Sequence, residues 1–304
     1  MTKGRPQLIV ITGPTASGKS ALAVDVASHL GCDIVSADSR QIYRGLPIGT
    51  AAPTADQLAA VRHHFVGILG LDEYYSAARF EAEATALLES LFENSDVAVM
   101  CGGSMMYIDA VTDGIDALPD ISDATRTRVR TLFETGGLEA LVAWLETIDP
   151  VYAAEVDRCN PRRVAHAIEI TLEAGRPYSA LRGRRAAERP FDVVKVAIDM
   201  PRERLFDRIN RRVDAMMEAG LLDEARRVYP QRHLNSLNTV GYKELFAYFD
   251  GEMPLDTAVA RIAKNTRVYA KKQLTWLARP SVRPTTWLPE DSSARDVLRA
   301  AGRL

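Results

Sequence analysis

An octapeptide near the start of the chain, Gly13-Pro-Thr-Ala-Ser-Gly-Lys-Ser20, has the G-x-x-x-x-G-K-S spacing of a phosphate-binding loop. Its glycines let the backbone curl so that successive N–H groups face an anion, and the helix that follows adds the positive end of its dipole. The lysine brings a point charge to the outer phosphates, and the serine hydroxyl suits Mg²⁺. The loop therefore predicts a bound phosphate compound without saying which one.

A carboxylate is expected at the end of a second strand if the loop belongs to a nucleotide-hydrolysing enzyme or a kinase, where it holds Mg²⁺ or the attacking water. The apolar run 97–103 ends in glycine, whereas the run 32–38 ends in Asp38. Sites in parallel sheets form at the carboxyl ends of the strands. Asp38 is therefore a candidate for proton transfer, and a carboxylate that binds magnesium or caps a helix is the alternative.

Short apolar runs alternate with helical patterns over the first hundred residues. Strands are predicted at 8–12, 32–38, 63–69 and 97–103, and helices at 20–30 and 80–92. This alternation predicts an α/β fold, a P-loop NTPase-like parallel sheet flanked by helices. His63 and His64 fall on one of these strands, where neighbours point to opposite faces, so we interpret the pair as structural rather than as a metal site.

The pattern becomes purely helical from about residue 115 to 189. Helices are predicted at 122–133, 138–148 and 160–175, with a break at 135–137 and a polar loop at 182–190. Strand character returns at 191–200, a long amphipathic helix follows at 203–220, and helical patterns continue to about 278. The proline-rich stretch 279–293 is predicted to be extended. We therefore expect a core of residues 1–114 and 190–304 interrupted by a helical insertion domain, 115–189.

Composition narrows the class of protein. The 304 residues carry a formal net charge of −2, so a nucleic-acid site would need local clustering of basic residues. The three cysteines form no CxxC pair, which argues against structural zinc or disulfides and favours a reducing cytosol. No apolar run of membrane-spanning length is present, and the first residues do not resemble a signal peptide. We expect a cytoplasmic protein without a membrane partner.

Several longer motifs follow the loop in a fixed order: "DSRQIYRGLPIGTA", "HHFVGI", "CGGSMMYIDAV", "DPVYAAEVDRCNPRRVAHAIEI", "VGYKE" and "AKKQLTWL". Together they resemble the tRNA dimethylallyltransferase (tRNA isopentenyltransferase) family over roughly residues 7 to 280. The resemblance implies transfer of a five-carbon prenyl group from dimethylallyl diphosphate to the exocyclic N6 amine of adenosine 37, next to the anticodon, in tRNAs that read codons beginning with U. The partners implied are dimethylallyl diphosphate and the tRNA anticodon stem-loop, and Mg²⁺ is the implied cofactor.

The resemblance also assigns roles to residues. Asp38 would accept a proton from the amine. Ser104 stands where the family usually has threonine and would contact the substrate or the tRNA through its hydroxyl, with a helix cap after the glycine pair as the alternative. Arg212 matches a basic position that contacts the diphosphate, although Arg208 and Arg211 lie close to it. The predicted diphosphate-binding residues are Gly13, Pro14, Thr15, Ala16, Ser17, Gly18, Lys19 and Ser20, with Ser20 also the magnesium ligand. The predicted tRNA-binding residues are Asp38, Ser39, Arg40, Gln41, Ser104, Arg126, Arg162, Arg163, Lys264, Arg267, Lys271 and Lys272.

Two basic stretches support a polyanionic partner. The segment from Arg158 to Arg189 contains eight arginines and three acidic residues, and the segment from Arg261 to Arg279 contains six basic residues and no acidic residue. On a helix the second group forms a one-sided basic stripe, which is an electrostatic footprint for nucleic acid. At Lys272 the family often has a polar residue or arginine, so a lysine keeps the charge but loses the planar fork.

Alternatives remain at this point. The same scaffold serves prenyltransferases that act on free adenine nucleotides, which have no evident need for the helical insertion or the basic stripe. A second alternative is a P-loop nucleotide kinase in which residues 182–190 form an arginine-rich lid. That hypothesis does not explain the motif "DSRQIYRGLPIGTA". A non-catalytic tRNA-binding protein would not need Lys19, Ser20 and Asp38 together. We expect the chain to act as a monomer.

Overall fold

The computed structural model describes residues 4–116, 118–182, 187–279 and 285–304. The chain divides into two compact units, a first unit of residues 1–113 and 188–304 and a second unit of residues 114–187. Residues 183–186 of the predicted polar loop and 280–284 of the predicted extended stretch lie outside the described residues.

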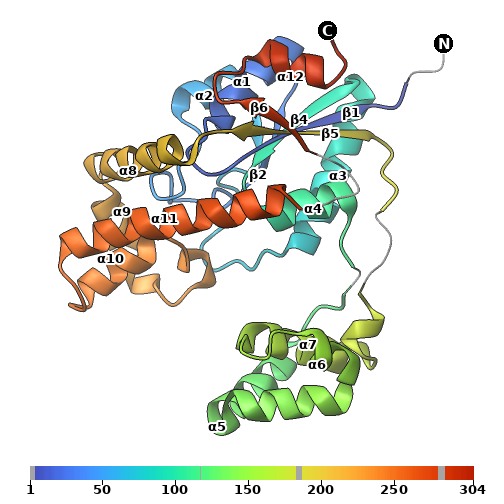
Figure 1. The fold of residues 1–304 in the computed structure, drawn as a ribbon, viewed down its shortest axis with the longest axis vertical. Helices are drawn as coiled ribbons and strands as arrows, with labels where there is room; N and C mark the ends of the chain where they lie inside the picture. The colour runs from blue at the N-terminus through green and yellow to red at the C-terminus, as the bar shows by residue number, and fades with distance from the viewer. Residues whose placement is uncertain (1–3, 117, 183–186, 280–284) are drawn as a thin grey trace. The chain divides into compact units, whose positions relative to one another are not determined.

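The described part of the first unit contains a six-stranded sheet in the order β3-β2-β4-β1-β5-β6, with every strand pair parallel (Figure 1). The predicted parallel α/β fold is thus confirmed. The buried strands read as continuous apolar runs because helices cover both faces. The strands are β1 (Gln7–Thr12), β2 (Ile34–Ala37), β3 (His63–His64), β4 (Val97–Gly102), β5 (Asp192–Asp199) and β6 (Thr285–Pro289).

One strand prediction needs correction. The run 63–69 forms only the two-residue β3, because Phe65 takes a left-handed φ of 63° that turns the chain out of the sheet. The ring of Phe65 is buried against Phe80 instead, edge to face with centroids 5.2 Å apart. Residues 285–289 of the proline-rich stretch are extended as predicted, and they also pair with β5 as the sheet edge β6.

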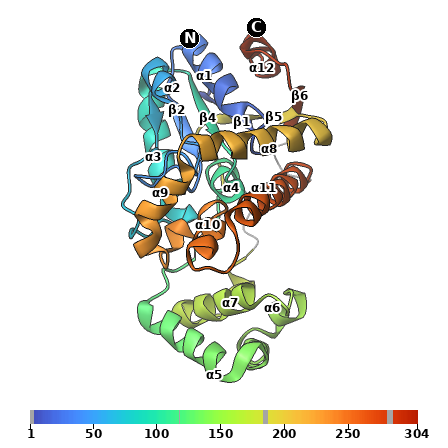
Figure 2. The same ribbon diagram turned by 90° about the vertical axis from the view of Figure 1, so that its left-hand side faces the viewer.

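Helices of the first unit cover the two faces of the sheet, as Figures 1 and 2 show. Alternate residues of β1 point to opposite faces. Leu8 and Val10 join the core under α3 and α4, and Ile9 and Ile11 join the core under α1 and α12. The helices are α1 (Lys19–Leu30), α2 (Ala55–Ala60), α3 (Ala77–Asn94), α4 (Met105–Asp113), α8 (Arg202–Glu218), α9 (Leu221–Val228), α10 (Tyr242–Phe249), α11 (Leu255–Leu277) and α12 (Ala294–Ala300).

The second unit is helical and has its own core. Its helices are α5 (Asp123–Ile148), α6 (Pro150–Glu155) and α7 (Pro161–Ala174). The predicted break inside α5 is present at Gly137, whose φ of 68° and ψ of −167° are not helical. Asn160 caps α7 by accepting the Arg163 N–H, with Pro161 at the first helical position as predicted. Buried apolar residues of α5, α6 and α7 pack together inside the unit.

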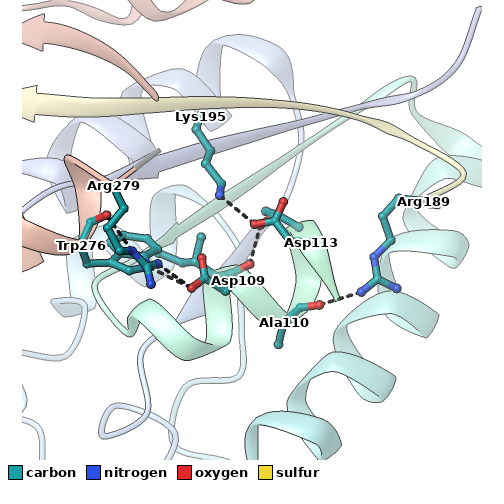
Figure 3. Close-up of polar contacts among 9 residues, drawn as sticks. Asp109, Ala110, Asp113, Arg189, Lys195, Trp276 and Arg279 are labelled. Carbon is teal, nitrogen blue, oxygen red and sulfur yellow. Dashed lines mark hydrogen bonds and ion pairs between the residues drawn. The ribbon is translucent and has the colours of Figure 1, made fainter. Parts of the chain in front are cut away.

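Helix α4, which the sequence pattern did not reveal, joins distant parts of the first unit (Figure 3). Asp109 accepts hydrogen bonds from Trp276 Nε1 and Arg279 Nη2, each at 2.9 Å. Asp113, the last residue of α4, accepts one at 3.2 Å from the buried Lys195 of β5. Arg189 donates to the Ala110 carbonyl at 2.6 Å. The helix therefore fixes α11, β5 and the segment just before β5 around one end of the sheet.

Candidate diphosphate and adenosine site

The phosphate loop has the expected position between β1 and α1, at the carboxyl edge of the sheet. Gly13 has a φ of 147° and Gly18 one of 99°, and Ala16 takes a left-handed φ of 66° that an alanine adopts only under local constraint. The turn is closed by the Ser17 N–H, which donates to the Pro14 carbonyl at 3.2 Å. Such alternating conformations turn backbone N–H groups inward and form a concave anion site.

Six predicted site residues line one cavity of about 60 Å³ beside this loop: Thr15, Lys19, Ser20, Asp38, Gln41 and Arg212. Burial is the main cause that lowers the pKa of Lys19, with Cys101 and Asp38 opposing the shift and Arg212 adding to it. Burial likewise lowers the pKa of Arg212, while Asp38 raises it. The structure thus places a carboxylate, a hydroxyl and two cations from three different elements around one small space.

Asp38 has one oxygen engaged in the local backbone. Its Oδ1 accepts the N–H of Arg40 at 2.8 Å and that of Gln41 at 3.3 Å, so the side chain does cap the turn that follows β2. No hydrogen bond within the described part of the chain reaches Oδ2. One carboxylate oxygen is therefore held in place while the other is open to accept a proton.

The glycine pair after β4 allows unusually close packing at this edge. A Cβ on Gly102 would lie 2.2 Å from the Ala37 carbonyl oxygen, and one on Gly103 would lie 2.5 Å from Gln273 Nε2. Ser104 follows: its hydroxyl accepts the Ser39 N–H at 2.8 Å and donates to the Ser39 hydroxyl at 3.0 Å. Ser104 is buried and positions the residue next to Asp38.

A wider cavity of about 600 Å³ adjoins the phosphate loop and is lined by Gly18, Lys19 and Ser20 together with arginines of α8. Arg208 and Arg212 are one helical turn apart, and an Nη of Arg208 lies 3.5 Å from where a Gly18 Cβ would stand. Arg211 also lines the cavity but pairs with Asp207 at 2.6 Å. Arg208 is exposed to solvent and lies over the loop.

Arg40 and Gln41 are largely occupied within the chain. The Arg40 guanidinium donates to the carbonyls of Asn235, Ser236 and Asn238. Gln41 Nε2 donates to the carbonyls of Thr50 and Ala51 at 3.2 and 2.9 Å. Both side chains therefore hold the loops around Asp38, and their predicted contact with tRNA stays a prediction.

Helix α11 presents the predicted basic stripe on one side. Arg261, Lys264, Lys271 and Lys272 are exposed, and Arg267 is half-buried, with Nη1 donating to Asn210 Oδ1 at 2.5 Å. Three residues on the other side bond to the segment that follows β4: Tyr269 Oη and Gln273 Nε2 donate to the Gly103 carbonyl, and Trp276 Nε1 donates to Asp109 of α4. The helix thus brings a charged face near the site and fixes that site with its opposite face.

Arg126, Arg162 and Arg163 belong to the second unit. Arg162 and Arg163 are exposed on the first turn of α7, and Arg126 Nε donates to the Ile121 carbonyl at 3.3 Å. Each contact with tRNA predicted for these residues stays a prediction.

The histidine pair separates as expected of neighbouring strand residues. His64 pairs with Asp33 at 2.8 Å, which is a structural contact. His63 lines the small cavity with Asp38, and its Nδ1 bonds to the Val61 carbonyl at 2.8 Å. Burial lowers the pKa of His63, which favours the neutral ring. The purely structural interpretation of the pair is therefore incomplete for His63.

The oxygen donors present fit a magnesium ion that is held mainly by a substrate. Ser20 and Asp38 line the same cavity and offer the hard oxygen ligands that Mg²⁺ prefers. Among the described residues no group of three or more His, Cys, Asp or Glu side chains could hold a metal ion by itself. Mg²⁺ commonly keeps several waters and binds one or two protein ligands together with phosphate oxygens.

Sequence reasoning missed Gln273 as a contributor to the site and did not assign Arg208 or His63 to it. Gln273 is buried on α11, where its Oε1 accepts the Thr15 N–H at 2.8 Å. A polar residue inside an apolar helical face was the available signal for Gln273, since such a side chain must find partners. Position relative to the loop identifies Arg208 and His63, and that requires the fold.

Comparisons with known proteins agree with this geometry. Residues 41–280 match the model of the IPP transferase family. The chain is 53% identical over 272 residues to tRNA dimethylallyltransferase 1 of Phocaeicola vulgatus, covering 90% of this chain and 91% of that protein. It is 52% identical over 287 residues to tRNA dimethylallyltransferase 2 of Parabacteroides distasonis, covering 94% and 95%.

A solved structure extends the likeness to three dimensions. The full-length tRNA isopentenylpyrophosphate transferase of Bacillus halodurans superimposes with a TM-score of 0.71 at 34% identity, covering 98% of this chain and 96% of that one. No helix in the described ranges is both long and apolar enough to cross a membrane. On the family match and these identities, the chain belongs to the IPP transferase family.

Proposed function

We propose that this chain transfers the dimethylallyl group of dimethylallyl diphosphate to the exocyclic N6 amine of adenosine 37 in tRNAs that read codons beginning with U. The observation that carries the proposal is the single cavity lined by Lys19, Ser20, Asp38 and Arg212. It combines a site for a diphosphate with a carboxylate that has one open oxygen. The curated relatives named tRNA dimethylallyltransferase support the same reaction.

Breaking the allylic C–O bond leaves cationic character on the prenyl carbon and negative charge on the diphosphate. The loop amides, Lys19 and Arg212 stabilise that negative charge where it develops. Arg208 and the outer cavity add positive potential on the same side. We propose that Ser20 would hold Mg²⁺ together with the diphosphate, and that a bound Mg²⁺ would supply further positive charge to the leaving group.

The acceptor amine is a poor nucleophile because its lone pair is conjugated with the adenine ring. Asp38 accepts one of its N–H hydrogens through Oδ2, which orients the amine and takes the proton as the C–N bond forms. The Arg40 and Gln41 amides hold Oδ1, and so fix the direction of the carboxylate. The charge balances: an amine proton passes to Asp38 and diphosphate leaves.

Adenosine 37 must leave the stacked anticodon loop to reach this site. We propose that the anticodon stem-loop binds the exposed basic side chains of α11 and the arginines of α7. All residues that line the two cavities belong to the first unit of one chain, which supports a monomer as the active form. A tRNA acceptor also supports action in the cytoplasm.

One experiment tests the proposal. The protein with Mg²⁺ is incubated with radiolabelled dimethylallyl diphosphate and either unmodified tRNA or AMP, and separately with ATP and nucleotide acceptors. Label in tRNA at the N6 position of adenosine 37 is the expected result. Label in AMP alone would indicate a prenyltransferase of free nucleotides, and phosphoryl transfer from ATP without prenyl transfer would indicate a kinase.

A further inference from the structure

Glu224 is a fully buried carboxylate of α9 that the reaction described above does not use. Its Oε2 accepts the N–H of Ile48 at 3.0 Å, and its Oε1 accepts the N–H of Gly49 at 2.7 Å. Oε1 also accepts a hydrogen bond from the hydroxyl of Tyr242 at 2.6 Å. A buried carboxylate is costly unless donors satisfy it, and here two backbone amides and one phenol do so.

The peptide that Glu224 holds is a wall of the site. Thr50 and Ala51 line the small cavity, and Ala51 also lines the outer one. Ala51 has a left-handed φ of 48°. From the other side, Gln41 donates to the carbonyls of Thr50 and Ala51. The segment 48–51 is therefore fixed through its amides by Glu224 and through its carbonyls by Gln41, three residues after Asp38.

Tyr242 sets how closely this segment approaches α10. A Cβ on Gly49 would lie 2.5 Å from the Tyr242 hydroxyl oxygen and 2.6 Å from Cζ, so glycine is required for the contact. Burial, and next the bond to Glu224, raise the pKa of the Tyr242 phenol, so the hydroxyl stays a donor throughout the physiological range. The motifs "GLPIGTA" and "VGYKE" thus meet through Gly49 and Tyr242.

We propose that Glu224 and Tyr242 are positioning residues for diphosphate binding, because they hold the segment 48–51 in place as the wall of the site beside Lys19. Neither residue lines either cavity, so both act through the backbone of that segment. The identity of the donor, dimethylallyl diphosphate, rests on the proposed function. The property that Glu224 and Tyr242 control is the affinity of the phosphate loop for a diphosphate.

The positioning role is tested with the variants Glu224→Gln and Tyr242→Phe, and Asp149→Asn is the matched control. Asp149 is also fully buried and also accepts two N–H bonds and one hydroxyl bond, from Tyr152, Ser179 and the Ser179 hydroxyl, but it belongs to the second unit. Three quantities are measured on the full chain: the Kd of inorganic pyrophosphate with Mg²⁺, the KM of dimethylallyl diphosphate, and the KM of tRNA.

The expected result for Glu224→Gln is a rise of about 10-fold or more in the pyrophosphate Kd and the donor KM, which equals about 1.4 kcal/mol. Tyr242→Phe leaves both hydrogen bonds from the backbone amides to Glu224. It should raise the pyrophosphate Kd and the donor KM about 3-fold, which is less than half the free-energy change expected for Glu224→Gln. The tRNA KM should not change in either variant. Asp149→Asn should lower stability to unfolding while the pyrophosphate Kd stays at the wild-type value.

Two outcomes would overturn the proposal. In the first, Glu224→Gln lowers the folded fraction and the apparent kcat but leaves the Kd and donor KM unchanged. In the second, Asp149→Asn raises the pyrophosphate Kd as much as Glu224→Gln does. If Glu224→Gln does not fold, Tyr242→Phe decides alone by the same Kd. Failure of wild-type protein to modify tRNA would refute the proposed function while a changed pyrophosphate Kd would still support this inference.

Discussion

Gln273 accepts a hydrogen bond from the backbone N–H of Thr15, 258 residues earlier in the chain, at 2.8 Å. The same amide group donates to the Gly103 carbonyl at 2.9 Å. One buried side chain of α11 therefore connects the phosphate loop with the glycine pair after β4. The basic helix is thus hydrogen-bonded directly to the phosphate loop.

Replacing Gln273 by leucine should weaken both stability and donor binding. The Thr15 N–H would lose its partner and the Gly103 carbonyl one of its two donors. An unsatisfied buried polar group costs about 1–3 kcal/mol. We expect a lower free energy of unfolding in urea and a donor KM raised several-fold. Thr275→Ala on the exposed side of α11 is the control. An unchanged donor KM in Gln273→Leu would show that the loop does not depend on this bond.

Asp38→Asn separates proton transfer from capping. Asparagine keeps an oxygen for the Arg40 and Gln41 amides but loses basicity, so kcat should fall by about 10²–10⁴-fold with little change in stability. Asp38→Ala should lose the same rate and about 1 kcal/mol of stability in addition. Single-turnover transfer to tRNA and urea unfolding measure the two effects. A wild-type rate in Asp38→Asn would leave capping as its sole role.

The arginines of α8 should differ in their effect on diphosphate affinity. Arg208→Ala and Arg212→Ala remove cations placed over the loop, and a charge-assisted contact of about 1.5–3 kcal/mol corresponds to roughly a 10- to 100-fold rise in the pyrophosphate Kd. Arg211→Ala should change the Kd much less, because Asp207 already pairs with that guanidinium. Calorimetric titration compares the three, and equal losses for all would contradict the assignment.

His63 should make stability dependent on pH below neutrality. Burial lowers its pKa from 6.5 in the folded chain, so the unfolded chain binds more protons between the two values. The contribution of neutral His63 to the free energy of unfolding is therefore complete above about pH 6.5, and it is lost as the pH falls toward the pKa of His63 in the folded chain. Urea unfolding at pH 7.5 and 5.5 should show a larger loss in wild type than in His63→Asn. Equal losses would mean that His63 does not titrate differently on folding.

The exposed lysines of α11 should govern the salt dependence of tRNA binding. Each phosphate contact contributes about one to the slope of log K against log salt. Lys271→Ala and Lys272→Ala should each reduce that slope without changing the donor KM. Lys243→Ala, an exposed lysine of α10 outside the stripe, is the control. Filter binding at several salt concentrations measures the slopes, and equal reductions in all three variants would refute a specific tRNA surface.

The parallel sheet was predictable because buried strands read as apolar runs and glycine ends several helices. The edge elements were not: β3 stops at His64 because Phe65 buries its ring, and β6 exists only because β5 offers an edge for residues 285–289. At the site, the phosphate loop and Asp38 could be predicted because each is part of a local sequence pattern. Glu224 could not, because the residue that it binds, Gly49, lies 175 residues away in the chain. No local pattern encodes such a contact, and only tertiary packing reveals it.

The chain leaves the first unit after Asp113 and returns to it at residue 188, and helix α4 anchors both points, through Asp113 bound to Lys195 and through Ala110 bound to Arg189 (Figure 3). No strand pairing of the described sheet involves residues 114–187. A variant in which a short linker replaces residues 114–187 therefore keeps every strand pairing of the described sheet and every residue that lines the two cavities. Because residues 114–187 carry part of the proposed tRNA-binding surface, grafting an RNA-binding module at this junction should change the choice of acceptor, while the proposed prenyl donor site is left as it stands.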